Sequence, residues 1–345
     1  MIFDVVVIGG GQAGLSMGYF LKKSHMKFII LDNQKRIGDS WRKRYDSLVL
    51  FTPRSHSSLP GLPLEGAQNV FPTKDEMADY LERYARTFDL PIQCEVEVEK
   101  VYKEGGIFYI QTGQSVIQAK RVIIATGPFQ TPRIPTFSKK LPQEIVQLHS
   151  SQYKNSSQLK EGSVLVVGGG NSGTQIAVEL SKTHDTFLSV GQKIRFLPLS
   201  LAGKSIFWWF EKIGILKANR HSTIGKRFKK LGDPIFGYEL KEKIKNQSVK
   251  LKGRSTTIHT DEVVFEDGSK MKVENIIWAT GFVSEYPWLH IPNVMTSSGQ
   301  VRHERGITEI NGLYFLGLPW QYRRGSALIL GVGDDAEYLM EHINH

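Results

Sequence analysis

Two short apolar runs, each followed at once by glycines, lie near the start of the chain and near its middle. Residues 3–8 (FDVVVI) and 163–167 (SVLVV) are rich in β-branched side chains, which is typical of buried parallel strands. Behind the glycines, apolar residues recur at helical spacing over residues 15–21 and 176–180. The pattern therefore predicts two strand–turn–helix units.

The remaining pattern predicts further strands and helices. Residues 27–31 are predicted to form a second strand, and residues 90–101 and 313–316 are predicted to form later strands. Residues 74–88 read as a helix whose apolar face carries Met77, Tyr80, Leu81 and Tyr84. After Gly331-Val332-Gly333, the pair Asp334-Asp335 is predicted to begin a final helix, which would return to the first unit.

The glycines of each unit have the spacing of a phosphate-binding turn. In such a turn the first glycine permits the bend, the second lets the backbone approach a pyrophosphate, and the third lets the helix pack on the strand. Free N–H groups at the helix N-terminus favour the phosphate charge. One such turn is a weak signal, but two in this context predict two dinucleotides. The turns are Gly9-Gly10-Gly11-Gln12-Ala13-Gly14 and, 159 residues later, Gly168-Gly169-Gly170-Asn171-Ser172-Gly173.

The two turns differ at the position that distinguishes dinucleotides. Asp32, 23 residues after Gly9, can accept hydrogen bonds from an adenosine ribose. The equivalent count from Gly168 reaches Gly191, with Lys193 and Arg195 close behind. Basic side chains can hold the 2′-phosphate of NADP through hydrogen bonds worth about 1.5 to 3 kcal/mol each, although these two can also be solvated charges. The sequence thus predicts that the first site binds FAD or NAD. It predicts that the second site binds NADP(H) in preference to NAD(H).

Two strands end in Ala-Thr-Gly, and their positions predict the domain organisation. Residues 121–127 (RVIIATG) and 275–281 (NIIWATG) each follow one of the turns, and a Pro-rich stretch at 128–135 reads as a linker. We predict an α/β fold with two dinucleotide-binding domains of the Rossmann type. The first domain comprises residues 1–150 and 282–345, and the second, residues 151–281, is inserted in it.

The cysteine count restricts the chemistry. Cys94 is the only cysteine, which excludes reductases that use a CxxC pair and fits a cytoplasmic protein. Cys94 itself reads as a small packed side chain. The opening residues contain Asp4 and lead into the first turn, so they read as a strand and not as a signal peptide, and no run of 18 apolar residues suggests a membrane span.

The net charge of +10 is concentrated in one segment. Residues 217–230 hold six Lys or Arg and no acid, directly after the aromatic cluster at 206–210 (IFWWF), and no nucleic-acid motif accompanies them. We call residues 200–245 the aromatic–basic segment, an insertion in the second domain. It can pack or line a substrate passage, attach to an anionic membrane surface, or form a subunit interface in a homodimer.

The ordered set of motifs resembles the class B flavin-dependent monooxygenases, which include the flavin-containing and YUCCA-like monooxygenases. Within that family the chain looks most like the small bacterial oxidoreductases of the CzcO type. The resemblance covers nearly the whole chain and implies two Rossmann-like domains that use FAD and NADPH. It rests on GGGQAGLSMGYFL (9–21), IGDSWRKRYDSLVLFTPRSH (37–56), FPTKDEMADYLERYA (71–85), both ATG exits and YFLGLPW (314–320).

The resemblance also implies roles for particular residues. On the FAD side these are Gly9, Gly11, Gln12, Ala13, Gly14, Asp32, Trp41 near the flavin, Val98 at the adenine, Thr126, Gly127 and Gly317. On the NADPH side they are Gly168, Gly170, Asn171, Ser172 and Gly173, and the further candidates on this side are Lys193 and Arg195, from their spacing, and Thr280.

His149 is the one candidate catalytic residue. The family signature FxGxxxHSxxY would begin at residue 143, and the chain retains His149, Ser150 and Tyr153 but has Gln143 and Ile145 at the Phe and Gly positions. A histidine in such a linker can also be a surface or capping residue. The altered signature leaves the exact subclass open.

The leading functional hypothesis is an NADPH-dependent monooxygenase. The resemblance implies that NADPH reduces FAD and that a flavin C4a-hydroperoxide passes one oxygen atom to a small soft nucleophile, at nitrogen, sulfur or a carbonyl carbon. O2 and this small molecule would be the partners, and no metal constellation is evident. One alternative is a cysteine-free NADPH reductase that passes electrons to a ferredoxin- or flavodoxin-type carrier or to oxygen. Another is a flavin-bound sensor or adaptor without catalysis.

Overall fold

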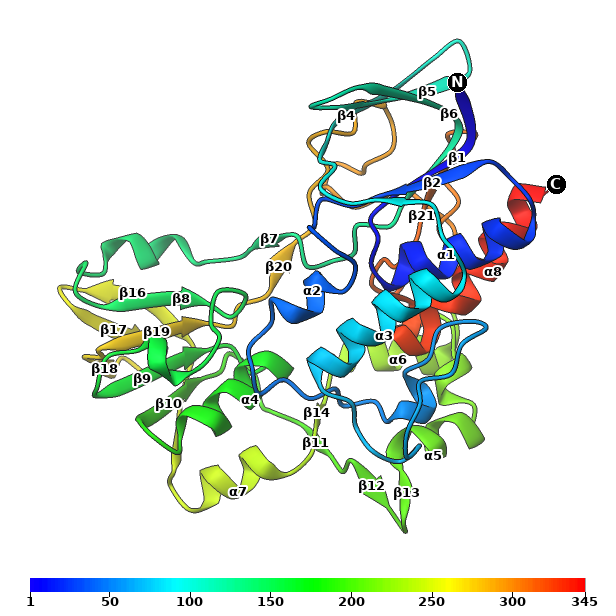
Figure 1. The fold of residues 1–345 in the computed structure, drawn as a ribbon. Helices are drawn as coiled ribbons and strands as arrows, with labels where there is room; N and C mark the ends of the chain where they lie inside the picture. The colour runs from blue at the N-terminus through cyan, green and yellow to red at the C-terminus, as the bar shows by residue number, and fades with distance from the viewer. Residues whose placement is uncertain (345) are drawn as a thin grey trace.

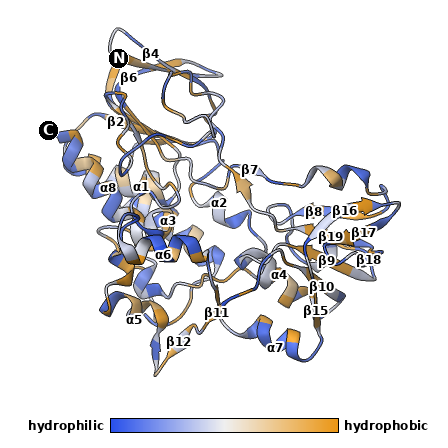
Figure 2. Ribbon diagram, turned by 180° about the vertical axis from the view of Figure 1, so that it is seen from behind, coloured by the Kyte–Doolittle hydropathy of each residue, from blue (hydrophilic) through white to orange (hydrophobic). Residues whose placement is uncertain are grey.

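The computed structural model describes residues 1–344 and shows two α/β units, each with a largely or wholly parallel central sheet (Figure 1). The predicted fold class is therefore confirmed. In both units the buried strands are mostly hydrophobic along their length (Figure 2). Such double-sided burial explains why the strands read as continuous apolar runs and do not alternate with polar residues.

The first sheet has the order β3-β2-β1-β6-β5-β4, with β21 beside the C-terminal half of β6. The strands β1, β2, β3, β6 and β21 run parallel, whereas β4 and β5 form an antiparallel ribbon on the N-terminal half of β6. The chain thus comes back to this sheet after the second unit. The bounds are β1 (Ile2–Ile8), β2 (Phe28–Leu31), β3 (Ile92–Gln93), β4 (Val98–Glu104), β5 (Ile107–Thr112), β6 (Val116–Ile124) and β21 (Leu313–Phe315).

Helices α1 (Gln12–Lys23), α3 (Lys74–Thr87) and α8 (Ile329–Asn344) cover one face of this sheet and share one apolar core with it. Helix α3 starts where predicted because Thr73 and Glu76 form a capping box that satisfies its first N–H groups. The short helix α2 (Asp39–Arg42) leads from the first unit toward the second (Figure 1).

Two predicted elements differ from the structure. The strand expected over 90–101 is split into β3 and β4, because the chain between them bends toward the end of β2, where the Val96 N–H donates to the Asp32 carbonyl at 2.9 Å. The last helix begins at Ile329, before the predicted Asp334. Its glycines are helical: a side chain on Gly331 would collide with the backbone of Gly325, so this glycine provides close packing and does not break the helix.

The second sheet has the order β15-β10-β9-β19-β8, with all strands parallel. Strand β8 pairs with β19, so the second domain starts before the predicted boundary at residue 151. The bounds are β8 (Val146–His149), β9 (Ser163–Val167), β10 (Asp185–Ser189), β15 (Val249–Lys252) and β19 (Asn275–Trp278). Helices α4 (Asn171–Leu180) and α7 (Glu239–Lys245) and an antiparallel sheet of β16 (Ser255–His259), β17 (Glu262–Phe265) and β18 (Lys270–Met271) complete the unit.

The aromatic–basic segment leaves the second sheet and packs against the first unit. Its core contains Ile206, Phe207 and Phe236, which lie against Phe51 and Leu330. Serines at 205 and 222 cap its two main helices. The elements here are β12 (Ser200–Leu201), β13 (Lys204–Ser205), α5 (Ile206–Lys212), the 3-10 helix η4 (Ile215–Lys217), α6 (Thr223–Leu231) and β14 (Ile235–Phe236), which pairs with β11 (Phe196–Leu197) just before the segment.

The two chain crossings between the units pair with each other. Strand β7 (Thr131–Pro132) and strand β20 (Phe282–Val283) form a short antiparallel ribbon that follows the two Ala-Thr-Gly exits. The remaining 3-10 helices are η1 (Arg54–His56), η2 (Thr136–Lys140), η3 (Ser156–Gln158) and η5 (Arg324–Ala327).

Candidate functional site

The first glycine turn lies between β1 and α1 and has the geometry of a phosphate cradle. Gly9 has φ +110°, a conformation that side chains other than glycine rarely adopt. A side chain on Gly14 would overlap the Gly9 carbonyl oxygen, so this glycine permits helix and strand to touch. A side chain on Gly11 would meet no atom within 4 Å. The backbone at Gly11 is therefore open to a ligand, as a pyrophosphate site requires.

The predicted FAD-side residues gather around this turn. The Asp32 carboxylate accepts hydrogen bonds from the N–H groups of Gly10 (2.5 Å) and Gln34 (2.8 Å), which fix it at the rim of the cradle. Gly317 lies against Ala13: a Cβ on the glycine would be 3.0 Å from the alanine methyl. Thr126 and Gly127 come shortly after β6, and the carbonyl of Ala125, the residue between β6 and Thr126, lies directly beside Gly9.

Gln12 connects this cradle with two other segments. Its amide donates to the Ala327 carbonyl at 3.3 Å, and its side-chain oxygen accepts from the Trp41 indole N–H at 3.4 Å. Trp41 and the η5–α8 junction are thereby brought to the cradle. Val98 lies further along, at the start of β4, whereas the Val96 N–H bonds the backbone of Asp32.

The second glycine turn, between β9 and α4, repeats the geometry of the first. Gly168 has φ +122°, and a side chain there would overlap the Ala279 carbonyl oxygen. A side chain on Gly173 would overlap the carbonyl oxygen of Gly168, whereas one on Gly170 would meet no atom within 4 Å. Asn171 and Ser172 form the first turn of α4. Both turns therefore fit the pyrophosphate of a dinucleotide, judged by the backbone alone.

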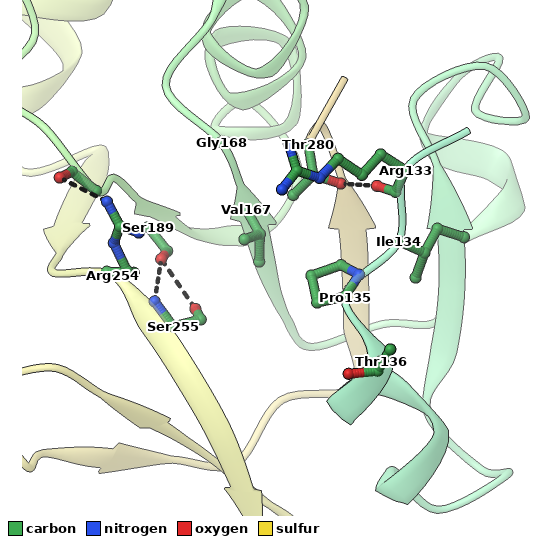
Figure 3. A pocket seen from close by; sticks show the side chains of 11 residues that line it. Arg133, Ile134, Pro135, Thr136, Val167, Gly168, Ser189, Arg254, Ser255 and Thr280 are labelled. Carbon is green, nitrogen blue, oxygen red and sulfur yellow. Dashed lines mark hydrogen bonds between the residues drawn. The ribbon is translucent and has the colours of Figure 1, made fainter. Parts of the chain in front are cut away.

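A cavity of about 460 Å³ opens beside the second turn (Figure 3). It lies at the carboxyl ends of β9, β10 and β19, where open parallel sheets bind ligands. Thr280 lines it and donates a hydrogen bond to the Arg133 carbonyl. The lining residues are Arg133, Ile134, Pro135, Thr136, Val167, Gly168, Ser189, Gly191, Arg254, Ser255 and Thr280.

Arg254 is a cavity residue that the sequence reasoning missed. Its guanidinium lies over Gly191, with Nη2 3.4 Å from the Gly191 carbonyl oxygen. A Cβ on Gly191 would be 2.8 Å from that nitrogen, so the missing side chain at 191 makes the room that Arg254 uses. A basic residue near this site was therefore to be expected, but Arg254 follows β15, whereas the basic residues predicted from the sequence follow β10.

The two basic residues predicted at this place behave differently from Arg254. Lys193 is exposed and does not line the cavity. Arg195 donates hydrogen bonds to the carbonyls of Leu231 and Gly232, the latter at 2.7 Å. It therefore holds the C-terminal end of α6, where a cation also interacts favourably with the helix dipole.

His149 is buried at the end of β8, and both of its ring nitrogens are bonded within the protein. Nδ1 accepts from the Ser151 N–H at 3.2 Å and also lies 2.9 Å from the Ser151 hydroxyl, so the proton resides on Nε2, which donates to the Gly281 carbonyl at 3.0 Å. Burial and the nearby Arg44 lower the pKa of His149, which favours the neutral ring. The histidine thus fixes the second chain crossing.

Arg44 is a second residue that the sequence reasoning missed. Its guanidinium carbon lies 4.7 Å from the ring centre of Phe129 and 5.4 Å from that of Phe282, between the two chain crossings. Burial lowers the pKa of Arg44. Within residues 1–344 no carboxylate lies within ion-pair distance of it. Cation–π contacts therefore stabilise a partly buried positive charge at the junction of the units.

The family comparisons agree with this pair of nucleotide sites. The family model described as "Pyridine nucleotide-disulphide oxidoreductase" matches residues 6–193, and the one described as "Flavin-binding monooxygenase-like" matches residues 196–307. The flavin-containing monooxygenase of Stenotrophomonas maltophilia superposes with a TM-score of 0.83 and 26% identity, covering 100% of this chain and 99% of that one. The protein is a flavin-dependent oxidoreductase of the monooxygenase type.

Sequence relatives define the group more narrowly. An uncharacterized CzcO-like oxidoreductase of Geobacillus kaustophilus is 56% identical over 345 residues, 100% of this chain and 99% of the relative. An uncharacterized oxidoreductase CzcO of Bacillus subtilis is 52% identical over 343 residues, 99% of each chain. The chain belongs to the CzcO-like oxidoreductases. More distantly, indole-3-pyruvate monooxygenase YUCCA1 of rice is 26% identical and covers 96% of this chain and 89% of its own.

No helix in the described part of the chain is both long and apolar enough to cross a membrane. Cys94 packs against the core of the first unit, and burial raises the pKa of its thiol. A lone cysteine cannot supply the disulfide that the name of the first family model mentions.

Proposed function

We propose that FAD occupies the Gly9–Gly14 cradle and NADPH the Gly168–Gly173 cradle, and that the enzyme transfers one atom of O2 to a small soft nucleophile. The observation that carries the assignment is the contrast between two otherwise equal cradles. The first has a fixed carboxylate, Asp32, at the place of the adenosine ribose. The second has an arginine, Arg254, over a glycine, which suits the 2′-phosphate of NADPH.

Bound FAD would supply hydride acceptance from NADPH and the activation of oxygen. The protein would hold and orient the two cofactors and keep water away from the flavin. Gln12 and Trp41 support the flavin side, because their mutual hydrogen bond fixes both side chains beside the first cradle. Arg44 and His149 lie at the junction where the two chain crossings meet: Arg44 contacts the Phe129 ring, and His149 bonds the Gly281 carbonyl. We assign Arg44 to the negative charge of NADPH, and His149 to positioning Gly281.

A small, mostly apolar cavity of about 30 Å³ marks one side from which a substrate can approach the first cradle, and an amine, thioether or ketone would have to push its walls apart to bind there. It lies between α5, α6 and the η5–α8 junction, next to Ala327, whose carbonyl bonds Gln12 of the first cradle. Its walls favour a substrate with an apolar part beside the reacting nitrogen, sulfur or carbonyl carbon. The lining residues are Phe207, Phe210, Ile215, Leu216, Ala218, Gly225, Phe228, Trp320, Arg324, Gly325, Leu328 and Leu330.

Isotope labelling tests the function. The purified protein with its FAD is given NADPH, ¹⁸O2 and a panel of apolar amines, thioethers and ketones, and both the label in the products and hydrogen peroxide per NADPH are measured. We expect one ¹⁸O atom in a product and little peroxide with a good substrate. Rapid NADPH-dependent reduction of ferredoxin or flavodoxin with little oxygen uptake would instead establish a reductase. A failure to oxidise NADPH under any condition would favour a sensor or adaptor.

A further inference from the structure

The hairpin β12–β13, helix α5, η4 and helix α6 form one exposed surface, which we call the α5–α6 surface. The hairpin and α5 lie at the end of the molecule opposite β4 and β5, and α6 lies further from that end (Figures 1 and 2). Four large aliphatic side chains point into solvent here: Leu201 is 53% exposed, Ile213 63%, Ile224 50% and Leu231 48%. Because these side chains stand singly and form no contiguous patch, they indicate an interaction only together with the charge and the aromatic residues of the same elements.

The charge of the same surface is strongly positive. Residues 200–232 contain eight Lys or Arg and a single acid, Glu211, which already lies 3.3 Å from the His56 ring. On α6, Lys226, Arg227, Lys229 and Lys230 are exposed, and none of them forms an ion pair within the described residues. The hydrophilic colour of α6 reflects these side chains (Figure 2). A partner with negative charge would complement them.

The aromatic residues of the surface are arranged as at a polar–apolar boundary. Trp208 and Trp209 meet edge to face at 4.8 Å, and both are only half-buried. The Trp209 indole N–H donates to the Leu201 carbonyl at 3.0 Å, which ties helix α5 to the hairpin. Ammonium groups of Lys204 and Lys212 lie 5.9 and 5.6 Å from the Trp208 ring centre. Tryptophans flanked by lysines are typical of the interfacial region of a lipid bilayer.

Helix α6 is held so that its basic face stays outward. Its Gly225 and Phe228 line the apolar cavity beneath, together with Phe207 and Phe210 of α5. The exposed lysines and arginine occupy the other side of this short helix. The inner sides of α5 and α6 thus face a common apolar cavity, and the exposed aliphatic side chains stand separately among the cations.

We propose that the α5–α6 surface binds the surface of an anionic lipid bilayer. Cations of α6 would contact lipid phosphates, and the exposed aliphatic residues would enter the headgroup region, an arrangement that combines the two contributions of interfacial binding. A nucleic acid would not use the aliphatic residues, and a protein partner normally requires a contiguous apolar patch. The binding requires neither cofactor turnover nor a particular substrate, so it stands independently of the proposed function.

Vesicle flotation of the purified full chain with its FAD tests the proposal. Vesicles of pure phosphatidylcholine are compared with vesicles that contain about 30% phosphatidylglycerol, in low and high salt. We expect binding to the anionic vesicles alone, and its loss at high salt, because exposed charges are screened within about 3 Å at 1 M. At about 1 kcal/mol per basic residue, the double variant K226E/K230E should bind at least about 30-fold more weakly.

Matched variants make the test specific. K241E/K245E makes the same change of charge at the same spacing on α7, outside the surface, and should bind as the wild type does. I213S should weaken binding, whereas V116S, at a site on β6 that is 51% exposed against 63% for Ile213, should not. Equal binding to both vesicle types, equal loss in both charge variants, or a dimer that I213S dissociates without any vesicle binding would each overturn the proposal. Unchanged NADPH oxidation in solution confirms that the variants are folded.

Discussion

Substitutions at Gly11 and Gly14 of the first cradle should separate an effect on ligand binding from an effect on folding. For Gly11→Ala we expect a folded protein without FAD, because the added methyl meets no protein atom and enters the space of the pyrophosphate. For Gly14→Ala, the methyl would overlap the Gly9 carbonyl oxygen and the protein should lose stability. Flavin absorbance and thermal unfolding of the purified variants measure this. Retention of FAD by Gly11→Ala at wild-type level would contradict the assignment.

Arg254 is the residue on which the choice of nicotinamide cofactor depends. Removing a guanidinium that holds a phosphate costs about 1.5 to 3 kcal/mol, so Arg254→Ala should raise KM for NADPH by about 10- to 100-fold. KM for NADH should change little. Lys193→Ala serves as the control because Lys193, which is exposed as Arg254 is, does not line the cavity. Steady-state kinetics with both cofactors decide. An effect of Lys193→Ala larger than that of Arg254→Ala would favour the prediction from the sequence.

His303 should make stability depend on pH. Burial, followed by the charge of Arg220, lowers the pKa of His303 to about 4, although Glu304 opposes the shift. In the unfolded chain its pKa is about 6.5, so the unfolded state binds the proton first, and the free energy of unfolding falls as pH drops from about 6.5 toward 4. His303→Asn, whose amide oxygen can still accept from the Gly306 N–H, should flatten this slope in denaturant titrations. An unchanged slope would be inconsistent with a buried neutral histidine.

At the level of single residues, the glycines of the two turns could be predicted from the sequence. Their spacing along the chain is set by the path of the backbone through the turn. The basic residues could not be predicted, since the position of a long side chain depends on the space around it. Arg195 follows the second strand as expected, yet it holds the end of α6. Arg254 reaches the cavity only because Gly191 has no side chain. The two residues follow different strands, so their proximity cannot be read from the sequence near either one.

At the level of elements, strand β8 and the chain after β19 are linked by one histidine. His149→Ala removes the hydrogen bond to Gly281, and the looser crossing should raise hydrogen peroxide release per NADPH consumed. His149→Gln can still donate from its side-chain amide and should restore most of the coupling. Peroxide and product are measured together with a true substrate. Unchanged coupling in His149→Ala would remove His149 from the mechanism.

Elements whose apolar runs end at a glycine turn or a cap were predicted well, as β9 and α3 show. The errors occurred where tertiary contacts override local signals. Between β3 and β4 the chain leaves the strand path to bond Asp32 and Gln34. At α8, glycines that look like helix breakers are helical because they pack closely: a side chain on Gly333 would meet Pro60.

At the level of the whole molecule, repetition of the strand–turn–helix unit was enough to predict the fold class. The contacts that orient the two units were not predictable, because they join distant segments of unlike character. Tyr45 packs in the core of the second unit, and its hydroxyl donates to Gln175 of α4 at 2.9 Å. Gln175 in turn donates to the Val49 carbonyl at 3.1 Å. This interface places the two cradles around the crossing that contains Arg44 and His149.

The central claim is that the two cradles bind different dinucleotides and that electrons pass between them. The most direct test is the anaerobic reduction of bound FAD by NADPH in Gly170→Ala. Its rate is measured as the loss of flavin absorbance after rapid mixing. Because Gly170 faces open space in the second cradle, this variant should keep its FAD and be reduced much more slowly than the wild type at low NADPH. Reduction at the wild-type rate, or loss of FAD from this variant, would contradict the account.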